Sequence, residues 1–382
     1  MVKIQLTKTK TIEIGGSGSG GSGSSAKIDL TGLELFADAC EGAPAVRIAR
    51  KSDGWHLTAA GSVPLPEGEL PSRWEDVSRQ PVWKLPKAFQ SPTAALAVNS
   101  TLSSFGQASA EAILRDMAQG LTREAIPARL SGGALQPKGT SPSSRKPTLP
   151  PPGVAVSENG RRFSVKPFAE EGFHLAASLP EFQALWLSRL LPEGHRPTTS
   201  SIQVAESALM ASPLLQPTFL EAKGSLLAII VRRDAIFFAG YRNGEPVLWR
   251  RCPGVRGYEA MRDAVGKNLG VGDDLINDVL EDSLVDPRPA LEPFLRPVLQ
   301  QLDLARVYLT GKHHLNSGNV LLLGLPYGAT HWKNMAEESL KIHVVPAKPF
   351  DGLSIGKGVD VSSGHLYLVA LGAAIAAAEV EL

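Results

Sequence analysis

Two similar runs of extended segments lie in the two halves of this sequence, and this recurrence constrains the fold most. The first run, between Leu33 and Leu65, reads LELFADA, VRIARK and WHLTAAGSVPL, separated by turn-rich residues. The second reads LLAIIV from Leu226, AIFFAGY from Ala235 and then Pro246–Arg250, with the hairpin signal Asn243-Gly244. Each run predicts an antiparallel meander. Because helical segments and further strands follow each meander, the chain predicts an α/β fold with two halves of like topology.

The segments around the meanders extend this prediction. Apolar residues at helical spacing predict helices at Ser109–Ala125, Tyr258–Leu269, Leu275–Leu284 and Leu291–Leu304. We expect the chain to close with a strand at Arg306–Thr310 and an Ala-rich helix at Leu366–Glu379. The stretch Leu130–Gly153 is rich in Pro, Gly and Ser, which predicts an insertion without regular structure inside a small subdomain.

These patterns divide the body of the chain into two lobes, each with a large and a small subdomain. The large N-terminal subdomain is predicted at residues 26–102 and 173–218, and the small one inserted in it at residues 103–172, with the Pro-rich loop 130–153. The large C-terminal subdomain is predicted at residues 219–258 and 303–382, with a small helical subdomain at residues 259–302.

The first 25 residues consist of two dissimilar parts. Residues 15–25 read GGSGSGGSGSS, an engineered-looking stretch that cannot bury apolar surface and behaves as a flexible tether. Residues 1–14 read MVKIQLTKTKTIEI, in which apolar and polar residues alternate, so one face of an extended strand is apolar. A tether raises the effective concentration of the segment it carries, so we interpret residues 1–14 as a peptide ligand. An expression tag or an edge-strand fragment is the alternative.

Composition and charge exclude several classes of protein. Of 382 residues, 43% are hydrophobic and 20% are charged, which is typical of a soluble globular chain. Lys and Arg total 39 against 38 Asp and Glu, and a net charge of +1 gives no field that collects nucleic acid. Neither a signal peptide nor a membrane-spanning segment is evident, and we expect a cytoplasmic protein.

Cysteine and histidine patterns give no sign of a metal or a nucleophile. The chain has two cysteines, Cys40 and Cys252, too few for a disulfide framework, and it contains neither HExxH nor CxxC. The Cys40 thiol lies between Asp38 and Glu41, and neighbouring anions disfavour a thiolate. We therefore expect no metal site and no catalytic residue.

The order of the elements resembles the actin-like ATPase fold, a ribonuclease H-like duplicated, two-lobed α/β fold. Within it, the chain resembles the PilM family of type IV pilus assembly proteins, which are relatives of FtsA. The resemblance spans residues 26–382 and rests on the order of several features. These are the meander ending at Ala60–Pro66, the segment Phe173–Met210, the Asn243-Gly244 hairpin and Pro349-Phe350-Asp351-Gly352 before the Ala-rich helix.

The first residues add to the resemblance. Val2, Lys3, Ile4, Gln5 and Leu6 are similar to the cytoplasmic start of the partner PilN proteins, with Gln5 where Asn is usual. The chain thus resembles a PilM-like protein joined through a Gly/Ser tether to its partner's docking peptide. The resemblance implies a groove for this peptide between the large N-terminal subdomain and the small inserted one.

The resemblance also implies an ATP site between the lobes, with an Asp-x-Gly turn in each meander and a Gly-rich turn near the adenosine. The matching turns here are Asp38-Ala39-Cys40-Glu41-Gly42, Arg232-Arg233-Asp234, and Gly311-Lys312-His313-His314 after Thr310. Bulky side chains obstruct the close backbone approach that phosphates need, and the second aspartate is lost. Asp38, Gly42, Thr310 and Gly311 are the cofactor-binding candidates, and we expect a degenerate site with no bound cofactor, Mg-ATP being the alternative.

These expectations combine into one function and its alternatives. The first is a cytoplasmic adaptor that binds the N-terminal peptide of a PilN-like inner-membrane protein by strand addition, contacts other pilus assembly components, and reaches the inner face of the inner membrane only through its partner. The second is an ATP-binding or ATP-switched filament protein in which Asp38 organises Mg²⁺ and Glu206 orients a water. A type II secretion protein is a third, but such proteins continue into a transmembrane helix that we do not find.

Overall fold

The computed structural model describes residues 28–37, 42–78, 83–119, 148–152, 155–168, 172–191, 197–272, 275–281, 286–315 and 318–378. Residues 1–14, the tether 15–25 and most of the Pro-rich loop 130–153 lie outside these ranges. The described chain divides into two compact units. The C-terminal unit contains Ser212–Leu368, and the N-terminal unit contains the described residues up to Ala211 and from Val369 onward.

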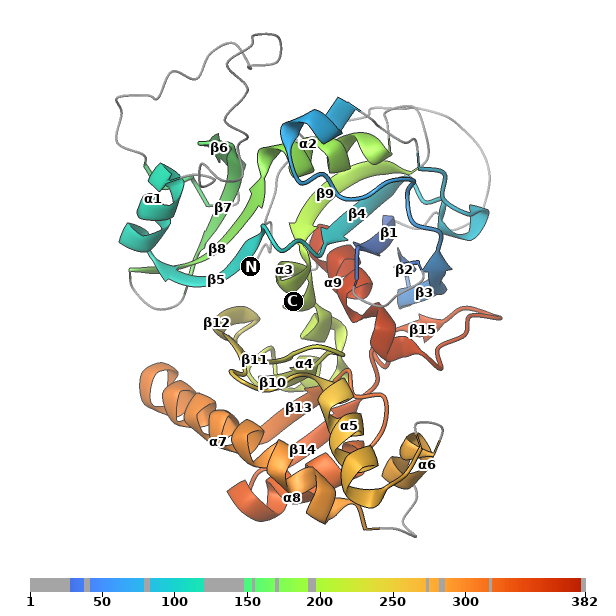
Figure 1. Ribbon diagram of the computed structural model, residues 1–382, viewed down its shortest axis with the longest axis vertical. Helices are drawn as coiled ribbons and strands as arrows, with labels where there is room; N and C mark the ends of the chain where they lie inside the picture. The colour runs from blue at the N-terminus through green and yellow to red at the C-terminus, as the bar shows by residue number, and fades with distance from the viewer. Residues whose placement is uncertain are drawn as a thin grey trace. The chain divides into compact units, whose positions relative to one another are not determined.

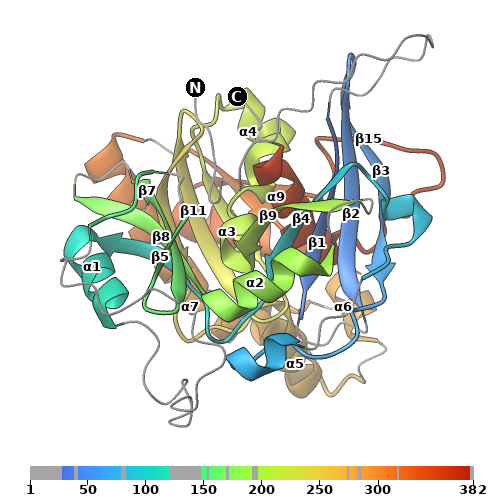
Figure 2. The same cartoon turned by 90° about the horizontal axis from the view of Figure 1, so that it is seen from above.

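The largest sheet of the N-terminal unit begins with the first predicted meander. Its strands are β1 (Ile28–Leu35), β2 (Ala43–Lys51), β3 (Gly54–Val63), β4 (Thr93–Val98) and β9 (Thr198–Val204). The first three pair antiparallel, β4 pairs parallel with β1, and β9 pairs parallel with β4, which gives the order β3-β2-β1-β4-β9 (Figure 2). Leu33, Leu96 and Trp186 of helix α2 (Glu181–Leu190) share the core on this sheet.

A smaller sheet completes the N-terminal unit. Its strands are β5 (Ser104–Ser109), β6 (Ala155–Glu158), β7 (Arg161–Pro167) and β8 (Phe173–Pro180), in the order β5-β8-β7-β6. Helix α1 (Ala110–Gln119) covers one face, where Ile113 and Met117 pack on Phe163 and Val165 (Figure 2). The helix predicted from Ser109 is therefore confirmed over the described residues.

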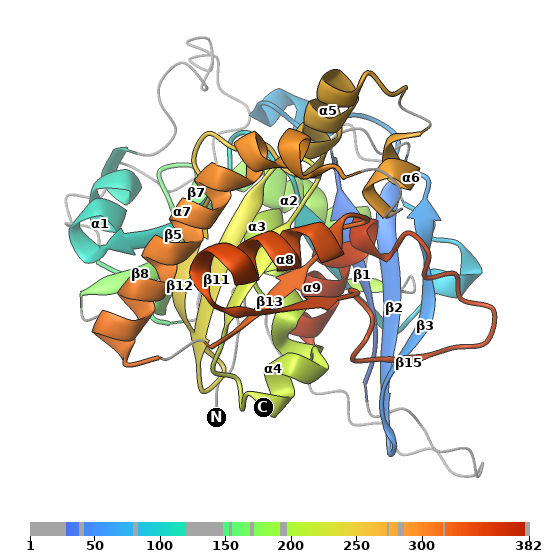
Figure 3. The same cartoon turned by 90° about the horizontal axis from the view of Figure 1, so that it is seen from below.

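The C-terminal unit begins with the second predicted meander. Its strands are β10 (Leu227–Val231), β11 (Ile236–Arg242), β12 (Glu245–Arg251), β13 (Asn319–Leu323) and β14 (His343–Ala347). Its longer helices are α5 (Tyr258–Leu269), α6 (Ile276–Glu281), α7 (Arg288–His313) and α8 (Ala329–Leu340). These helices share one core with the sheet, and Figure 3 shows α7 and α8 lying across it.

The two large sheets have the same topology. In the C-terminal unit β10, β11 and β12 pair antiparallel, β13 pairs parallel with β10, and β14 pairs parallel with β13. The order β12-β11-β10-β13-β14 therefore repeats β3-β2-β1-β4-β9 strand for strand. The predicted duplication of architecture is confirmed.

The remaining elements are short or join the sheets. They are α3 (Ala205–Leu209), α4 (Pro217–Glu221), α9 (Leu368–Ala377), β15 (Ser354–Ile355) and 3-10 helices at Trp74–Ser78, Lys87–Phe89, Ser212–Leu215 and Gly364–Tyr367 (Figure 1). Helix α9 is the Ala-rich helix predicted near the end of the chain.

One predicted element is wrong. Arg306–Thr310 was expected to be a strand but lies inside α7, which runs unbroken to His313 despite Pro293 and Pro297. The segment VYLT favours a strand by its β-branched and aromatic residues. However, Ala305, Leu309 and His313 are buried at a spacing of four residues, so burial of one helical face determines the structure of the segment.

The Pro-flanked stretch with Trp74 and Trp83 packs on the N-terminal unit. Trp83 is buried, and its Nε1 donates to the carbonyl of Pro64 at 2.8 Å. Trp74 makes an edge contact with Phe182, their ring centroids lying 5.9 Å apart. Both tryptophans therefore attach this loop to the core of the N-terminal unit.

Candidate functional site

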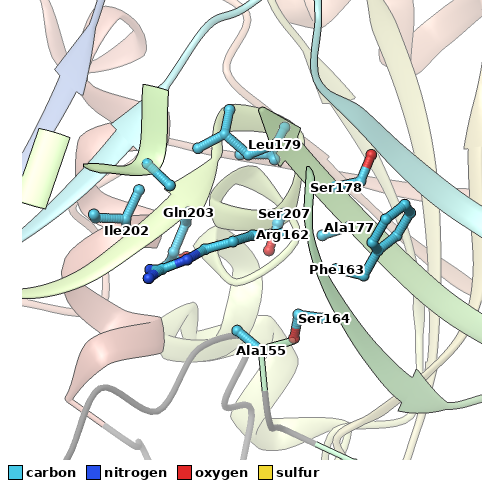
Figure 4. A pocket seen from close by; sticks show the side chains of 12 residues that line it. Ala155, Arg162, Phe163, Ser164, Ala177, Ser178, Leu179, Ile202, Gln203 and Ser207 are labelled. Atoms are coloured by element: carbon cyan, nitrogen blue, oxygen red, sulfur yellow. The ribbon is translucent and has the colours of Figure 1, made fainter. Parts of the chain in front are cut away.

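A narrow pocket opens between the small sheet and β9, entirely within the N-terminal unit (Figure 4). Its walls come from β6, β7 and β8 on one side and from α2, β9 and α3 on the other. The space open to water-sized spheres is about 50 Å³, which is room for a few water molecules or side-chain carbons. A side chain fits such a space, and a nucleotide does not.

Strand alternation produces the wall formed by the small sheet. Successive side chains of a strand point to opposite faces, so β7 directs Phe163 and Val165 to the core under α1 and directs Arg162 and Ser164 to the pocket. The antiparallel register places Leu179 of β8 opposite Arg162 and Ala177 opposite Ser164. Ala177 and Leu179 of β8 therefore face Arg162 and Ser164 of β7 across this wall.

Three oxygens on the pocket lining are buried without a hydrogen-bond partner. They are Ser164 Oγ, Gln203 Oε1 and Ser207 Oγ, and their residues are 4%, 6% and 0% exposed. A buried polar atom without a partner costs about 1–3 kcal/mol, so most such atoms in proteins are paired. All three belong to residues that line this one pocket.

The orientation of the Gln203 amide follows from its neighbours. Its Nε2 donates to Ser201 Oγ at 3.3 Å and to the carbonyl of Ala373, in α9, at 3.4 Å. A carbonyl oxygen only accepts, so the amide nitrogen belongs on that side and Oε1 lies on the other. Figure 4 shows Gln203 between Ile202 and the side chain of Arg162.

Two adjacent arginines of β7 serve different purposes. Arg161 binds within the sheet, where an Nη donates to Ser178 Oγ at 2.6 Å and to the carbonyl of Leu102 at 2.7 Å. Burial lowers the pKa of Arg161. Arg162 is exposed, and its guanidinium extends across the pocket toward Gln203 (Figure 4).

Some residues singled out from the sequence lie outside the described ranges, and the others are divided between the two units. Val2, Lys3, Ile4, Gln5, Leu6 and Asp38 lie outside the described ranges. Gly42 precedes β2, where an added Cβ would lie 2.4 Å from Ser62 Oγ, so close approach of β3 requires glycine there. Glu206 lies in the first turn of α3.

Thr310 and Gly311 lie in the C-terminal unit, inside α7. Thr310 Oγ1 donates at 3.3 Å to the carbonyl of Leu315, which lies just beyond the end of that helix. The turn expected after Thr310 is therefore absent, and these two residues do not follow a strand as a nucleoside-binding turn of this fold requires.

The turn that does follow a central strand of this sheet was missed by the sequence analysis. Strand β13 ends at Leu323, and Gly324-Leu325-Pro326-Tyr327-Gly328 leads into α8. Gly324 and Gly328 have φ of +88° and +73°, which favour glycine. A Cβ on Gly324 would also lie 2.4 Å from the carbonyl oxygen of Val231. The signal was present in the apolar run VLLL followed by two glycines around a proline.

The turn between β10 and β11 is closed by its own chain. The N–H of Arg232 donates to the carbonyl of Ala235 at 2.8 Å, and Arg232 Nε pairs with Asp234 Oδ1 at 3.3 Å. The first N–H groups of α5 bind the turn, since Tyr258 N donates to the carbonyl of Arg232 at 2.9 Å. Arg233 pairs with Glu259 of the same helix.

An aromatic cluster joins this turn to the β13–α8 turn. The ring of Tyr258 lies 6.2 Å from that of Tyr327 and 5.6 Å from that of His365, measured between centroids. Burial raises the pKa of Tyr327 and lowers the pKa of His365. The cluster therefore holds His365 in its neutral form more strongly than water does.

Acidification is expected to destabilise the protein partly through His365. Its pKa is lower in the folded protein than the ordinary value of about 6.5, so the unfolded chain binds more protons and the free energy of unfolding falls as pH decreases from about 7.5 to about 5.5. In His365→Phe, which keeps an aromatic ring beside Tyr258, part of this decrease is lost. Thermal unfolding at the two pH values measures this decrease in stability for the parent protein and for the variant. The exposed His314→Asn variant keeps the full decrease, and an unchanged decrease in His365→Phe would contradict the prediction.

No group of three or more His, Cys, Asp or Glu in the described ranges is arranged to hold a metal ion. No helix in the described part of the chain has the length and apolar character needed to cross a bilayer.

Comparison with known proteins gives matches in structure only. No family model matches the sequence, and no curated protein matches it. Among solved structures, one titled "PilM-PilN type IV pilus biogenesis complex" is similar over 93% of this chain and 100% of its own, with 15% identity and a TM-score of 0.52. The chain has an actin-like, two-lobed fold. The predicted fold class is thereby confirmed.

Two other structures are similar to a lesser degree. A Bacteroides thetaiotaomicron protein with an actin-like ATPase fold and unknown function has 8% identity and a TM-score of 0.37 over 86% of this chain and 94% of its own. An archaeal actin homolog has 18% identity and a TM-score of 0.32 over 49% of this chain and 59% of its own.

The family resemblance places the phosphate contacts of the C-terminal unit at the β10–β11 turn. Phosphate binding in a tight turn needs backbone N–H groups that small residues leave accessible, and Mg²⁺ needs carboxylates. This turn has no glycine, the N–H of Arg232 is bonded to Ala235, and the carboxylate of Asp234 is paired with Arg232. The hydrogen-bonding groups of this turn are therefore engaged with one another.

Proposed function

We propose that this protein is a cytoplasmic adaptor of the type IV pilus assembly machinery that binds the extended N-terminal segment of an inner-membrane partner. The observation that carries the proposal is the pocket between the small sheet and β9, with apolar lining and three buried oxygens without partners. Its position between the large sheet and the inserted small sheet agrees with the groove implied by the PilM resemblance. Similarity in fold to a PilM–PilN complex supports the choice of partner.

An extended peptide satisfies both properties of the pocket at once. Val2, Ile4 and Leu6 alternate along residues 1–14, so a strand presents them on one face to apolar walls such as Ala177 and Leu179. Each apolar side chain moved out of water contributes about 1.5–3 kcal/mol. The main chain of the strand supplies N–H and C=O groups for the buried oxygens, as in other strand-addition complexes.

The proposal extends to partners and location. Residues 1–14 correspond to the cytoplasmic start of a PilN-like protein. The Gly/Ser tether keeps them at an effective concentration in the mM range, about that of short flexible linkers. The adaptor reaches the inner face of the inner membrane only through this partner and contacts other pilus assembly components, with no role for nucleic acid. We propose that it acts without Mg-ATP, because the β10–β11 turn is closed by α5.

Titration of a synthetic peptide tests the proposal. The receptor is the full chain with Ile4→Asp and Leu6→Asp, which keeps its tether while its own first residues no longer compete for the pocket. We expect the peptide of residues 1–14 to bind with a Kd on the order of 1 μM, with the same Kd in the presence of Mg-ATP at mM concentration. Isothermal titration calorimetry measures both.

The matched control is the same peptide with Ile4→Asp and Leu6→Asp, which should not bind. No binding of the parent peptide at mM concentration would reject the adaptor function. Binding that requires Mg-ATP would instead support the alternative, a nucleotide-switched actin-like protein.

A further inference from the structure

Helices α7 and α8 of the C-terminal unit border a groove that the proposed function does not use. The two helices lie side by side and are in contact (Figure 3). The space open to water-sized spheres in the groove is about 620 Å³, more than ten times that of the pocket beside β9. Its lining on the α7 side runs from Asp286 to Asp303, which corresponds to about 25 Å of helix. The groove is therefore long enough for about four helical turns of a partner.

Apolar side chains line the groove between its charged residues. They are Leu299 of α7 and Met335 and Leu340 of α8, and all three are half-buried and pack against the core of the unit. The apolar character continues along α7, because Leu304 and Val307 are 52% and 64% exposed. Val307 lies four residues, about one helical turn, after the last lining residue of α7, so both lie on the same side of the helix. Exposed apolar side chains that continue a groove are typical of a protein docking surface.

Charged side chains accompany these apolar residues, and most of them are paired. Three ion pairs lie along α7 and at its start: Asp286 with Arg288 at 2.8 Å, Glu292 with Arg296 at 2.7 Å and Asp303 with Arg306 at 3.6 Å, measured between N and O. Glu338 of α8 is a fourth carboxylate of the lining, and it forms no ion pair within the part of the chain that the structure describes. The groove therefore has one negative charge that these arginines leave unbalanced.

The position of Glu338 in its helix adds to this imbalance. Glu338 lies in the last turn of α8, where the partial negative charge of the helix end makes a carboxylate unfavourable by about 0.3–1 kcal/mol. The neighbouring Glu337 is compensated, because its Oε1 accepts the N–H of Val344 at 3.1 Å and pairs with His343 Nδ1 at 3.0 Å. A cation from a partner would compensate Glu338 in the same way.

We propose that this groove binds a basic amphipathic helix of a partner protein, with apolar side chains against Leu299, Met335 and Leu340 and a lysine or arginine beside Glu338. The walls of the groove are helices, whose main-chain groups are bonded internally, so an extended segment would find no strand to pair with. A helix satisfies its own main chain and presents apolar side chains at the spacing of the groove. Nucleic acid and anionic lipid would place phosphates beside Glu338 and are disfavoured.

Two synthetic peptides of opposite charge test the inference. Both are helices of about 18 residues, about 27 Å long, with leucines at helical spacing and alanine and glutamine elsewhere. One carries a pair of lysines beside the leucines, and the other carries glutamates at the same positions. Fluorescence anisotropy with the full chain at about 50 mM salt should give a Kd on the order of 100 μM for the lysine peptide and binding at least about tenfold weaker for the glutamate peptide.

Glu338→Lys locates the binding site. We expect this variant to bind the lysine peptide about tenfold more weakly than the parent does. Its Tm should stay within about 3 °C of the parent value, because a lysine in the last turn of a helix interacts favourably with the helix dipole. The matched control is Glu221→Lys, since Glu221 is exposed at the end of α4 in the same unit and does not line the groove. This control changes the net charge equally, and its Kd should stay within about twofold of the parent value.

Three results would each overturn the inference. They are no binding of the lysine peptide at about 1 mM, equal affinity for the lysine and glutamate peptides, and equal affinity of the Glu338→Lys and Glu221→Lys variants for the lysine peptide. The proposed function is tested separately, because it concerns the N-terminal unit and is measured with the peptide of residues 1–14. Failure of either proposal therefore leaves the other in place.

Discussion

Ala177→Leu is expected to weaken binding of the partner segment by about a hundredfold or more. This is the effect of losing the burial of one or two apolar side chains of the segment. Ala177 lies on β8 and faces the pocket opposite Ser164. The pocket offers about 50 Å³, and the additional carbons of leucine occupy that space. The peptide titration into the full chain with Ile4→Asp and Leu6→Asp measures the effect, with thermal unfolding recorded alongside to show that the receptor is folded.

A matched substitution distinguishes the effect of filling the pocket from the effect of adding an apolar side chain to the same sheet. Ser157 is exposed on β6, two residues after the pocket-lining Ala155. Ser157 itself does not line the pocket. Ser157→Leu therefore adds an apolar side chain to the same sheet outside the site, and the Kd should stay within about twofold of the parent receptor. If Ala177→Leu binds as tightly as Ser157→Leu, the segment docks elsewhere.

The halves of the fold were predictable because each is built from local signals. The meanders alternate apolar residues between tight turns, and the α5 boundaries match the helical spacing at Tyr258–Leu269. The parallel strands β13 and β14 carried weaker signals, since short apolar runs such as NVLLL do not distinguish a buried strand from a helix.

The position of the nucleoside-side turn illustrates how local propensity misleads. Val307-Tyr308-Leu309-Thr310 has the composition of a strand, and Gly311 follows it like a turn residue. Burial of Leu309 in the helix core overrides that preference. The turn with this place in the topology is Gly324–Gly328, after β13.

The pocket itself was beyond the reach of sequence reasoning. Ser164, Gln203 and Ser207 are ordinary polar residues in their own segments, and only pairing of β7 with β8 and of β4 with β9 brings them to one cavity. Their common property, a buried oxygen without a partner, exists only in the folded chain. The family resemblance indicated the subdomains that border the groove but not its residues.

Gly32→Ala is expected to lower the free energy of unfolding of the N-terminal unit by about 3 kcal/mol, at the upper end of the usual cost of overpacking. Gly32 lies in β1 directly under α9. A Cβ there would lie 1.9 Å from the carbonyl oxygen of Ala370 and 2.9 Å from the Cβ of Ala374. Both neighbours belong to a helix whose backbone cannot shift alone, so β1 and α9 must separate. Thermal unfolding should show a decrease in Tm of roughly 6–12 °C.

Gly61→Ala is the matched control for this effect. Gly61 also lies inside a strand of the same sheet, β3, but a Cβ there meets only Phe89 Cζ at 3.6 Å, an ordinary van der Waals contact. Because alanine restricts the unfolded chain more than glycine does, this variant should be as stable as the parent or more stable by up to about 1 kcal/mol. The difference between the two variants isolates the contact of β1 with α9 from the general effect of replacing a strand glycine. Equal Tm values for Gly32→Ala and Gly61→Ala would show that α9 does not pack on β1 as described.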